Sequence, residues 1–168
     1  MADFIESVTE TLFSNIINIP VVRANQNGPR PKLPYASYQI TACKTVGSDE
    51  YGEIDDDGVI QIKGVREGTI MVNFFGADAK EIAGDLVNCI KKISSRELMR
   101  KLKLVISNTG NVSDITALRD DMHFETMANV ELTFRYTCLY TDHVGIIETV
   151  DAASTVGKEP IHQVITID

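Results

Sequence analysis

Apolar residues near the N-terminus recur at intervals of three and four. This stripe runs through residues 3–17 and stops before Pro20. The spacing predicts an amphipathic helix because one helical turn takes 3.6 residues. Residues 21–35 then carry three prolines and a glycine, which cannot continue a helix or a strand ladder. We therefore expect a helix followed by an extended loop.

The next apolar pattern is typical of β-strands. Residues 35–45 mix aromatic, β-branched and small side chains. Two further apolar runs, residues 59–65 and 69–76, flank the short sequence Arg66-Glu67-Gly68. This arrangement predicts one strand and then a β-hairpin whose turn lies at residues 66–68. The acidic residues 49–57 are expected to form a solvent-exposed segment that leads into that hairpin.

A helical period returns in the middle of the chain. Apolar residues at three- and four-residue intervals predict an amphipathic helix over residues 78–93. Ser94 and Glu97 have the spacing of a capping box, which predicts a second short helix over residues 94–103. We expect both helices to pack on the sheet.

The clearest alternation in the chain covers residues 124–140, where apolar and polar side chains exchange at every second position. One face of this strand is expected to be buried and the other solvated. An extended segment followed by a polar turn at residues 108–111 precedes it, and residues 145–150 are expected to pair with it in a closing hairpin. Together the elements predict an α+β fold, with a mixed or antiparallel sheet packed against two or three helices.

The chain length favours one main domain. The 168 residues suffice for a single core, and residues 1–150 contain every element that could build it. Residues 151–168 are too short to form a core and are predicted to be a C-terminal extension. Their apolar alternation suggests the hypothesis that Val164, Ile165 and Ile167 add an edge strand to a neighbouring subunit.

Charge and leader sequences exclude several classes of protein. The 16 basic and 24 acidic residues give a net charge of -8, which argues against a dedicated DNA-binding role. The acidic N-terminus does not resemble a signal peptide, and no apolar run approaches about 18 residues, so we expect neither secretion nor membrane spanning. Cys43, Cys89 and Cys138 are far apart and odd in number, which predicts reduced core residues.

The acidic segment is the local pattern most similar to a metal site. Glu53, Asp55 and Asp57 place carboxylates at alternate positions before a glycine, as in the start of an EF-hand loop. The twelfth position is Gly64 instead of glutamate, and a strand pattern follows where a helix belongs. A solvated acidic hairpin is therefore favoured over a calcium site.

Other catalytic and cofactor motifs lack support in the sequence. The three histidines have no metal-ligand spacing, no serine lies in a nucleophile elbow, and no glycine-rich phosphate loop is present. We expect no enzyme activity, no cofactor and no metal. One cationic cluster stands out, for which a solvated helix face is favoured over contact with a partner or with phosphate. It comprises Lys91, Lys92, Arg96, Arg100, Lys101 and Lys103.

Two stretches of the chain resemble neck or tail terminator proteins of long-tailed bacteriophages. They are VVRANQNGPRPKLPYASY at residues 21–38 and VSDITALRDDMHFETMANVELTFRYTCLYTDHVGIIETV at residues 112–150. The most specific part is the loop from Arg23 to Tyr35. Family members often have arginine where this chain has Met127, so an interface role is not carried over to that position.

The resemblance implies a structural virion protein of the tail or neck, assembled in the host cytoplasm. Such a protein caps the completed tail tube as a homohexameric ring and joins it to the head-to-tail connector. The implied partners are further copies of the chain, the tail tube protein, the connector or collar protein and, in contractile particles, the tail sheath. DNA passes through the bore without specific binding. The alternatives are another connector or tail-completion component and, from a different class, a small acidic ligand- or calcium-binding module.

A ring traversed by DNA suggests positions for the charged and polar residues. An acidic bore repels phosphate, so we place the acidic segment toward the bore or a ring face; it comprises Asp49, Glu50, Glu53, Asp55, Asp56 and Asp57. Closure into a ring would also satisfy exposed sheet edges. The residues predicted to contact neighbouring subunits or partners are Arg23, Asn25, Gln26, Asn27, Arg30, Val164, Ile165 and Ile167.

Overall fold

The protein is built on a mixed five-stranded sheet, and the computed structural model describes residues 2–120, 123–146, 149–156 and 159–166. The strand order is β1-β2-β3-β7-β4. β1 runs parallel to β2, whereas β4 pairs antiparallel with β7. The predicted α+β class with a mixed sheet is confirmed. The strands are β1 (Val21–Arg23), β2 (Tyr35–Ile54), β3 (Val59–Phe75), β4 (Leu104–Asp114) and β7 (Met127–His143).

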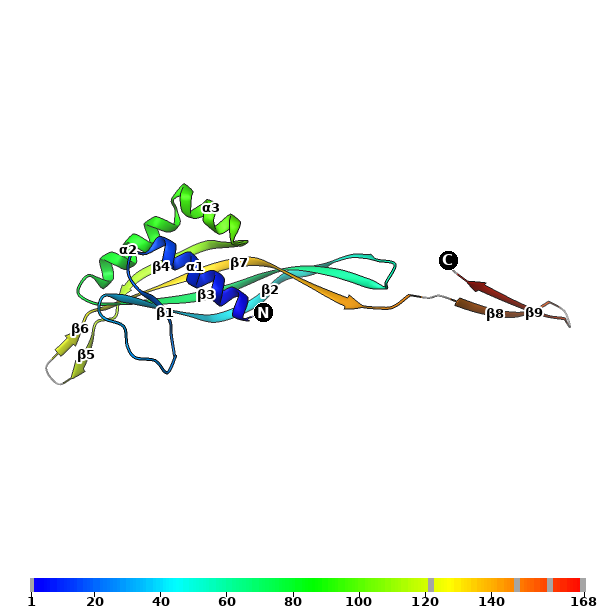
Figure 1. Cartoon of the computed structure of the whole chain (residues 1–168), viewed down its shortest axis with the longest axis horizontal. Coiled ribbons are helices and arrows are strands. Elements are labelled where there is room, and N and C mark those ends of the chain that lie inside the picture. Colours follow the sequence, from blue (N-terminus) through cyan, green and yellow to red (C-terminus); the bar gives the residue numbers. More distant parts are fainter. Residues whose placement is uncertain (1, 121–122, 147–148, 157–158, 167–168) are drawn as a thin grey trace. The chain divides into compact units, whose positions relative to one another are not determined.

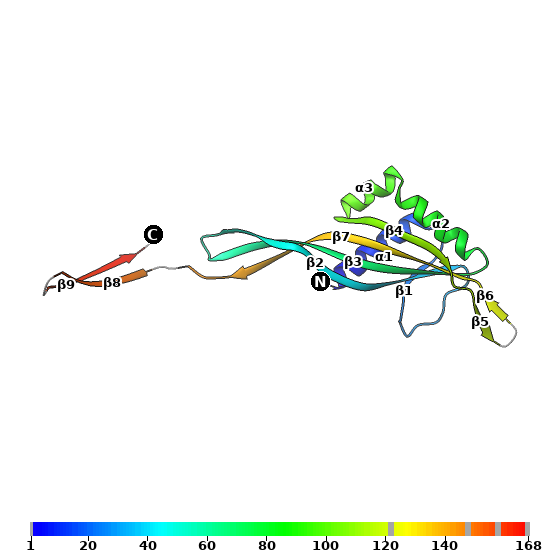
Figure 2. The same ribbon diagram turned by 180° about the vertical axis from the view of Figure 1, so that it is seen from behind.

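Three helices share one hydrophobic core with this sheet (Figure 1). They are α1 (Ala2–Ile16), α2 (Ala79–Ile90) and α3 (Ile93–Lys101). The helices contact one another, and α2 and α3 both contact β4. The view from behind shows these two helices beside β4 (Figure 2). The predicted helices are confirmed, because their apolar stripes are the faces that lie in the core. None of the described helices is long and apolar enough to cross a membrane.

The alternation in β7 supplies much of the core. Its even-numbered side chains from Ala128 to Cys138 are buried, while Glu131, Arg135 and Thr137 are exposed. Phe134 is fully buried, and Gly68 of β3 lies directly against its ring. The predicted division into a buried and a solvated face is therefore confirmed.

The hairpin turn predicted at residues 66–68 is wrong, because β3 is continuous through Gly68. The turn lies earlier, where the Asp55 Oδ1 accepts hydrogen bonds from the N–H groups of Asp57 and Val59 at 3.1 and 2.8 Å. Gly58 has a positive φ of 71°, which suits glycine. Gly68 has a packing role, so its position in the sequence does not mark a turn. As a consequence, residues 49–54 belong to β2 instead of a loop.

Three smaller expectations also need correction. The polar residues 108–111 are not a turn; they lie in β4, which accommodates them through two register irregularities against β7. Ser94 is inside α3, whose N-cap is Lys92 with no capping side chain. Cys43 is exposed, because it lies on the solvated part of β2, although Cys138 is buried as predicted.

Two further β-hairpins lie outside the main sheet. β5 (Ala117–Asp120) pairs with β6 (His123–Glu125), and β8 (Thr149–Val156) pairs with β9 (Glu159–Thr166). The predicted closing hairpin is thus wrong: the strand that follows β7 pairs with the C-terminal segment. We call β8 and β9 the C-terminal hairpin.

The chain divides into two compact units. The first contains Met1–Ser48 and Gly64–Cys138, and the second contains Asp49–Lys63 and Leu139–Asp168. The helices and the hydrophobic core belong to the first unit. The β2–β3 turn and the C-terminal hairpin belong to the second. A domain boundary at residue 150 stays a prediction.

Candidate functional site

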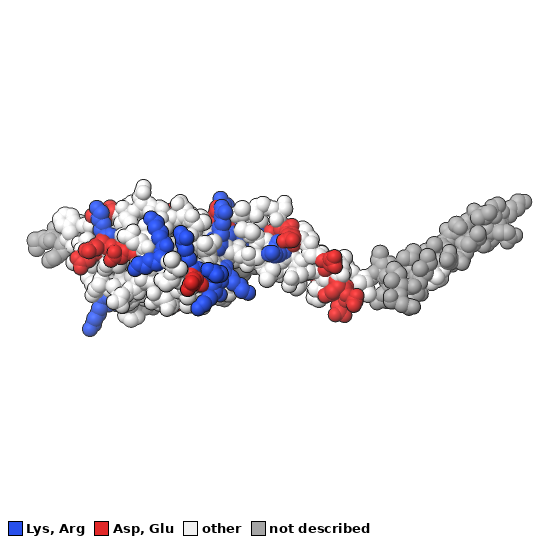
Figure 3. Space-filling model, turned by 90° about the horizontal axis from the view of Figure 1, so that it is seen from above, with Lys and Arg blue, Asp and Glu red and all other residues white. Residues whose placement is uncertain are grey.

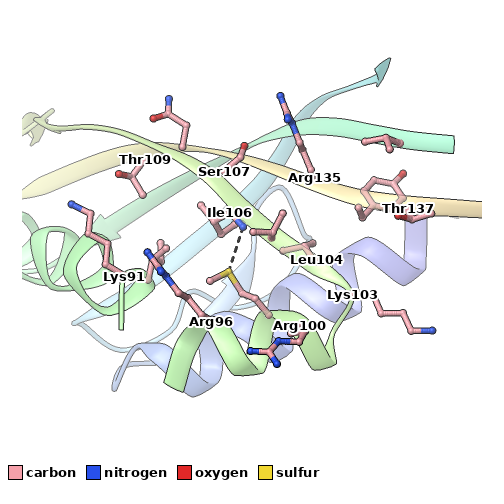
Figure 4. A pocket seen from close by; sticks show the side chains of 16 residues that line it. Lys91, Arg96, Arg100, Lys103, Leu104, Ile106, Ser107, Thr109, Arg135 and Thr137 are labelled. Atoms are coloured by element: carbon pink, nitrogen blue, oxygen red, sulfur yellow. Dashed lines mark hydrogen bonds between the residues drawn. The ribbon is translucent and has the colours of Figure 1, made fainter. Parts of the chain in front are cut away.

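A groove runs along β4 beside α3, in the first unit (Figure 4). It encloses about 810 Å³. Its apolar lining includes the buried side chains of Ile90, Met99, Leu104 and Ile106. The backbone N–H of Ile106 donates a hydrogen bond to the Met99 Sδ at 3.3 Å, which ties α3 to β4. The groove therefore lies at the edge of the hydrophobic core and is open to solvent along β4.

Five cationic side chains border this groove: Arg135 of β7 pairs with Glu67, and the other four come from the helical region. Lys91, Arg96, Arg100 and Lys103 come from the end of α2, from α3 and from the turn after α3, and all four are exposed. Figure 3 shows Lys and Arg side chains gathered on this face of the molecule. Within the described residues, none of the four has a carboxylate at ion-pair distance. We call this feature the basic groove.

The structure thus brings together part of the cationic cluster seen in the sequence. Lys92 and Lys101 are exposed but do not line the groove. Arg100 and Lys101 lie in the last turn of α3, where positive charge stabilises the partial negative charge of a helix C-terminus. The helix C-terminus accounts for these two positions, but it does not account for Lys91, Arg96 and Lys103, which border the same apolar groove beside an open strand.

An ion-pair network covers the sheet beside the groove. Glu67 of β3 receives a hydrogen bond from the Arg135 Nε at 2.7 Å, and the Lys44 Nζ lies 3.0 Å from its other oxygen. Hydrogen bonds from Arg135 and then Lys44 lower the pKa of the Glu67 carboxyl below its ordinary 4.5. This network connects β2, β3 and β7.

The depressed pKa of Glu67 leads to a prediction about acid stability. Its ionised form contributes stability above the unfolded-state pKa near 4.5, and this contribution is lost as the pH falls through the lower folded-state pKa. Glu67→Gln should therefore flatten the fall of the melting temperature below about pH 5. Part of the dependence should remain, because hydrogen bonds from Thr116 also lower the pKa of Asp114.

Melting curves recorded between neutral and acid pH would measure this effect. Glu131→Gln is the matched control, because Glu131 is exposed on β7 and has no ion-pair partner within the described chain. A Glu67→Gln variant with the same pH profile as the wild-type protein would contradict the role given to this network.

The acidic segment forms the end of the β2–β3 hairpin, in the second unit. Asp49 accepts a hydrogen bond from the Tyr140 hydroxyl at 2.7 Å. The Glu50 Oε2 lies 3.8 Å from the Lys63 Nζ. Asp55 shapes the turn through the two hydrogen bonds already described. Glu53, Asp56 and Asp57 are exposed. No group of three or more metal-ligating side chains occurs among the residues that the structure describes.

The proline-rich loop is held by Arg30. The Arg30 guanidinium lies 5.4 Å from the ring centres of both Tyr35 and Phe75, and its Nε donates to the Tyr35 hydroxyl at 2.9 Å. Arg30 also forms an ion pair with Glu125 of β6. Sequence reasoning missed this clamp, since Glu125 is 95 positions away.

The other residues predicted to contact partners lie at several places. Arg23, at the end of β1, pairs with Glu6 of α1. The loop residues Asn25, Gln26 and Asn27 are exposed. Val164, in β9, is 58% exposed, and Ile165 pairs with Val150 in the backbone register of the C-terminal hairpin. The side chain of Ile165 and all of Ile167 lie outside the described residues. Their role in partner contacts stays a prediction.

Charge is divided unequally between the two units. Of the 24 acidic and 16 basic residues, 11 acids and 2 bases belong to the second unit, which leaves 13 acids and 14 bases in the first. The formal net charges are therefore -9 and +1. The basic groove lies in the first unit, and the acidic segment lies in the second.

The comparisons with known proteins point to one family. A family model described as phage neck terminator protein matches residues 3–160, which is most of the chain. The match includes the proline-rich loop, the basic groove, the acidic segment and β8. No curated protein matches the chain.

Proposed function

The chain belongs to the phage neck terminator protein family, and on that premise we propose that it caps the tail tube as a ring and joins it to the head-to-tail connector. Family membership itself assigns a structural role in the phage neck and tail, in association with other head or tail components. A structural role is consistent with the absence of a catalytic motif in the sequence. The ring, its contacts and its order of assembly are the proposal.

The observation that carries this proposal is the pair of open edges of the main sheet. β4 ends the sheet on one side. On the other side, β1 covers β2 only at residues 36–38, and no described strand pairs with the outer edge of β2 beyond them. Open edges favour pairing with another chain. Pairing of one of these edges with a different strand of the next subunit is heterologous, and it closes into a ring when the rotation per subunit permits.

The proposed ring is a homohexamer with the tail tube on one face and the connector or collar protein on the other. In contractile particles it would also contact the sheath. The acidic segment faces the bore or a ring face in this proposal, where its carboxylates would repel DNA phosphates and prevent specific binding. The net charge of -9 on the second unit supports this assignment. A different connector or tail-completion role would require the same self-association but other partners.

Removal of residues 151–168 tests the contribution of the C-terminal extension. We expect the shortened chain to keep its circular dichroism spectrum and melting temperature, because the core lies in the first unit. Its oligomeric mass should fall, since most of the C-terminal hairpin is gone. Native mass spectrometry, with and without purified tail tubes, would measure both self-association and partner choice.

Two results would contradict parts of this proposal. If the wild-type chain stays monomeric at high concentration and on tail tubes, the ring is wrong. If the shortened chain keeps the wild-type oligomeric mass, residues 151–168 are not part of the subunit interface. Binding to connectors but not to tubes would favour the alternative connector role.

A further inference from the structure

The open edge of β4 can accept a further β-strand. β4 spans 11 residues and pairs on one side with β7, while no described strand pairs with its other side. Val105 is 48% exposed on this strand, and Ser107 and Asn108 are exposed beside it. The Ile106 N–H already donates to the Met99 Sδ, so an added strand would pair with other backbone groups of β4, next to the apolar lining of the basic groove.

The C-terminal hairpin needs a further strand or packing surface for stability. It is a two-stranded sheet, and such a hairpin is at best marginally stable in water without a third strand or another packing surface. β9 has eight residues, pairs on one side with β8, and presents an exposed Val164. Its other edge can therefore accept a strand, and its length suits that of β4.

Charge favours the same pairing. The segment from Leu139 to Asp168 contains five acidic residues and one basic residue. The basic groove provides four exposed cations without carboxylate partners among the described residues. Opposite charges across an interface raise the rate of association and select the correct partner. The flanking lysine and arginine side chains would also discourage strands that lack acidic residues.

We infer that β9 of one subunit adds to β4 of a second copy of this chain, and that the acidic residues of the donor's segment from Leu139 to Asp168 interact with Lys91, Arg96, Arg100 and Lys103 of the receptor. The inference rests on the proposed ring function and identifies the surface that receives the C-terminal extension. It makes each subunit both donor and receptor, as a heterologous ring requires.

Two full-length variants separate the donor from the receptor. The double substitution Arg96→Glu with Arg100→Glu reverses the charge at two positions of the groove and leaves β9 unchanged. Val164→Pro with Ile165→Pro removes one strand N–H from each edge of β9, since successive N–H groups point to opposite edges, and leaves the groove intact. We expect each variant alone to assemble with a dissociation constant raised by about tenfold or more. Equimolar mixing should produce a 1:1 complex, because one variant supplies β9 and the other the groove.

Sedimentation velocity and native mass spectrometry would measure these species after circular dichroism has confirmed folding. The charge-matched control is Lys32→Glu with Lys80→Glu, two exposed positions outside the groove, which should assemble as the wild-type chain does. High salt should weaken wild-type assembly as groove reversal does, because exposed charges are screened.

Several results would overturn this inference. One is a charge-reversed groove variant that still forms the wild-type ring. The proposed ring function would then stand, but β4 would not be the receiving surface. Another is a mixture that forms no complex, as expected if β9 docks on its own chain or elsewhere. A third is groove reversal that preserves the oligomer but abolishes retention of a short DNA duplex, which would make the groove a phosphate site. A wild-type chain that never assembles, even on tail tubes, would overturn the ring and this inference together.

Discussion

Gly68→Ala is expected to destabilise the protein by about 3 kcal/mol, the upper part of the usual range for overpacking a core. A Cβ atom on Gly68 would lie 2.5 Å from the Phe134 Cζ and 2.6 Å from the backbone oxygen of Ala42. Phe134 is fully buried, so its ring has no solvent to move into. The Ala42 oxygen belongs to β2, and moving it requires a shift of the strand itself.

Gly84→Ala provides the matched control, with the opposite sign. Gly84 lies inside α2, and a Cβ atom there would meet no atom within 4 Å. Alanine in a helix is more favourable than glycine by about 0.5–1 kcal/mol, so this variant should be more stable than the wild-type protein. Urea denaturation of both variants would give the two free energies of unfolding. A neutral Gly68→Ala would show that β2 and Phe134 can move apart at little cost.

Arg30→Ala is expected to lower the free energy of unfolding by about 2 kcal/mol. The estimate combines the loss of a charged hydrogen-bond and ion-pair partner with the loss of a cation–π contact. The Glu125 side chain that pairs with Arg30 is only 14% exposed, so solvent replaces the guanidinium poorly. The proline-rich loop should then be cut faster in limited proteolysis, because Arg30 fastens it to Tyr35, Phe75 and β6.

Arg30→Lys and Lys32→Ala make this test specific. Lysine keeps the charge but has no planar group to contact both rings or to bind both carboxylate oxygens, so an intermediate loss of about 1 kcal/mol is expected. Lys32 is exposed in the same loop, and its removal should change stability by less than about 0.5 kcal/mol. If Arg30→Ala left unfolding unchanged but weakened assembly, Arg30 would be a partner contact and not a clamp.

The two stability predictions depend on contacts that sequence reasoning did not find. The sequence predicts a turn at Gly68, but glycine serves both turns and close packing. Local sequence does not separate these two uses. Only the approach of Phe134 and Ala42, from two other strands, shows which one applies. Likewise, the sequence predicts a partner contact for Arg30, and no local pattern reveals its ion pair with Glu125, which is 95 positions away.

The amino-acid sequence by itself determined the three helices, the buried face of β7, the α+β class and the resemblance to neck terminators. The helices, the buried face of β7 and the fold class depend on periodicity within a short segment, which secondary structure converts directly into a buried face. The resemblance depends instead on the residues of the stretches 21–38 and 112–150. Only the tertiary structure decided the true hairpin turn, the clamp at Arg30, the two open sheet edges and the cations around one groove. Those features are set by strand order and by side chains distant in sequence, because packing brings them together and no local pattern records that they meet.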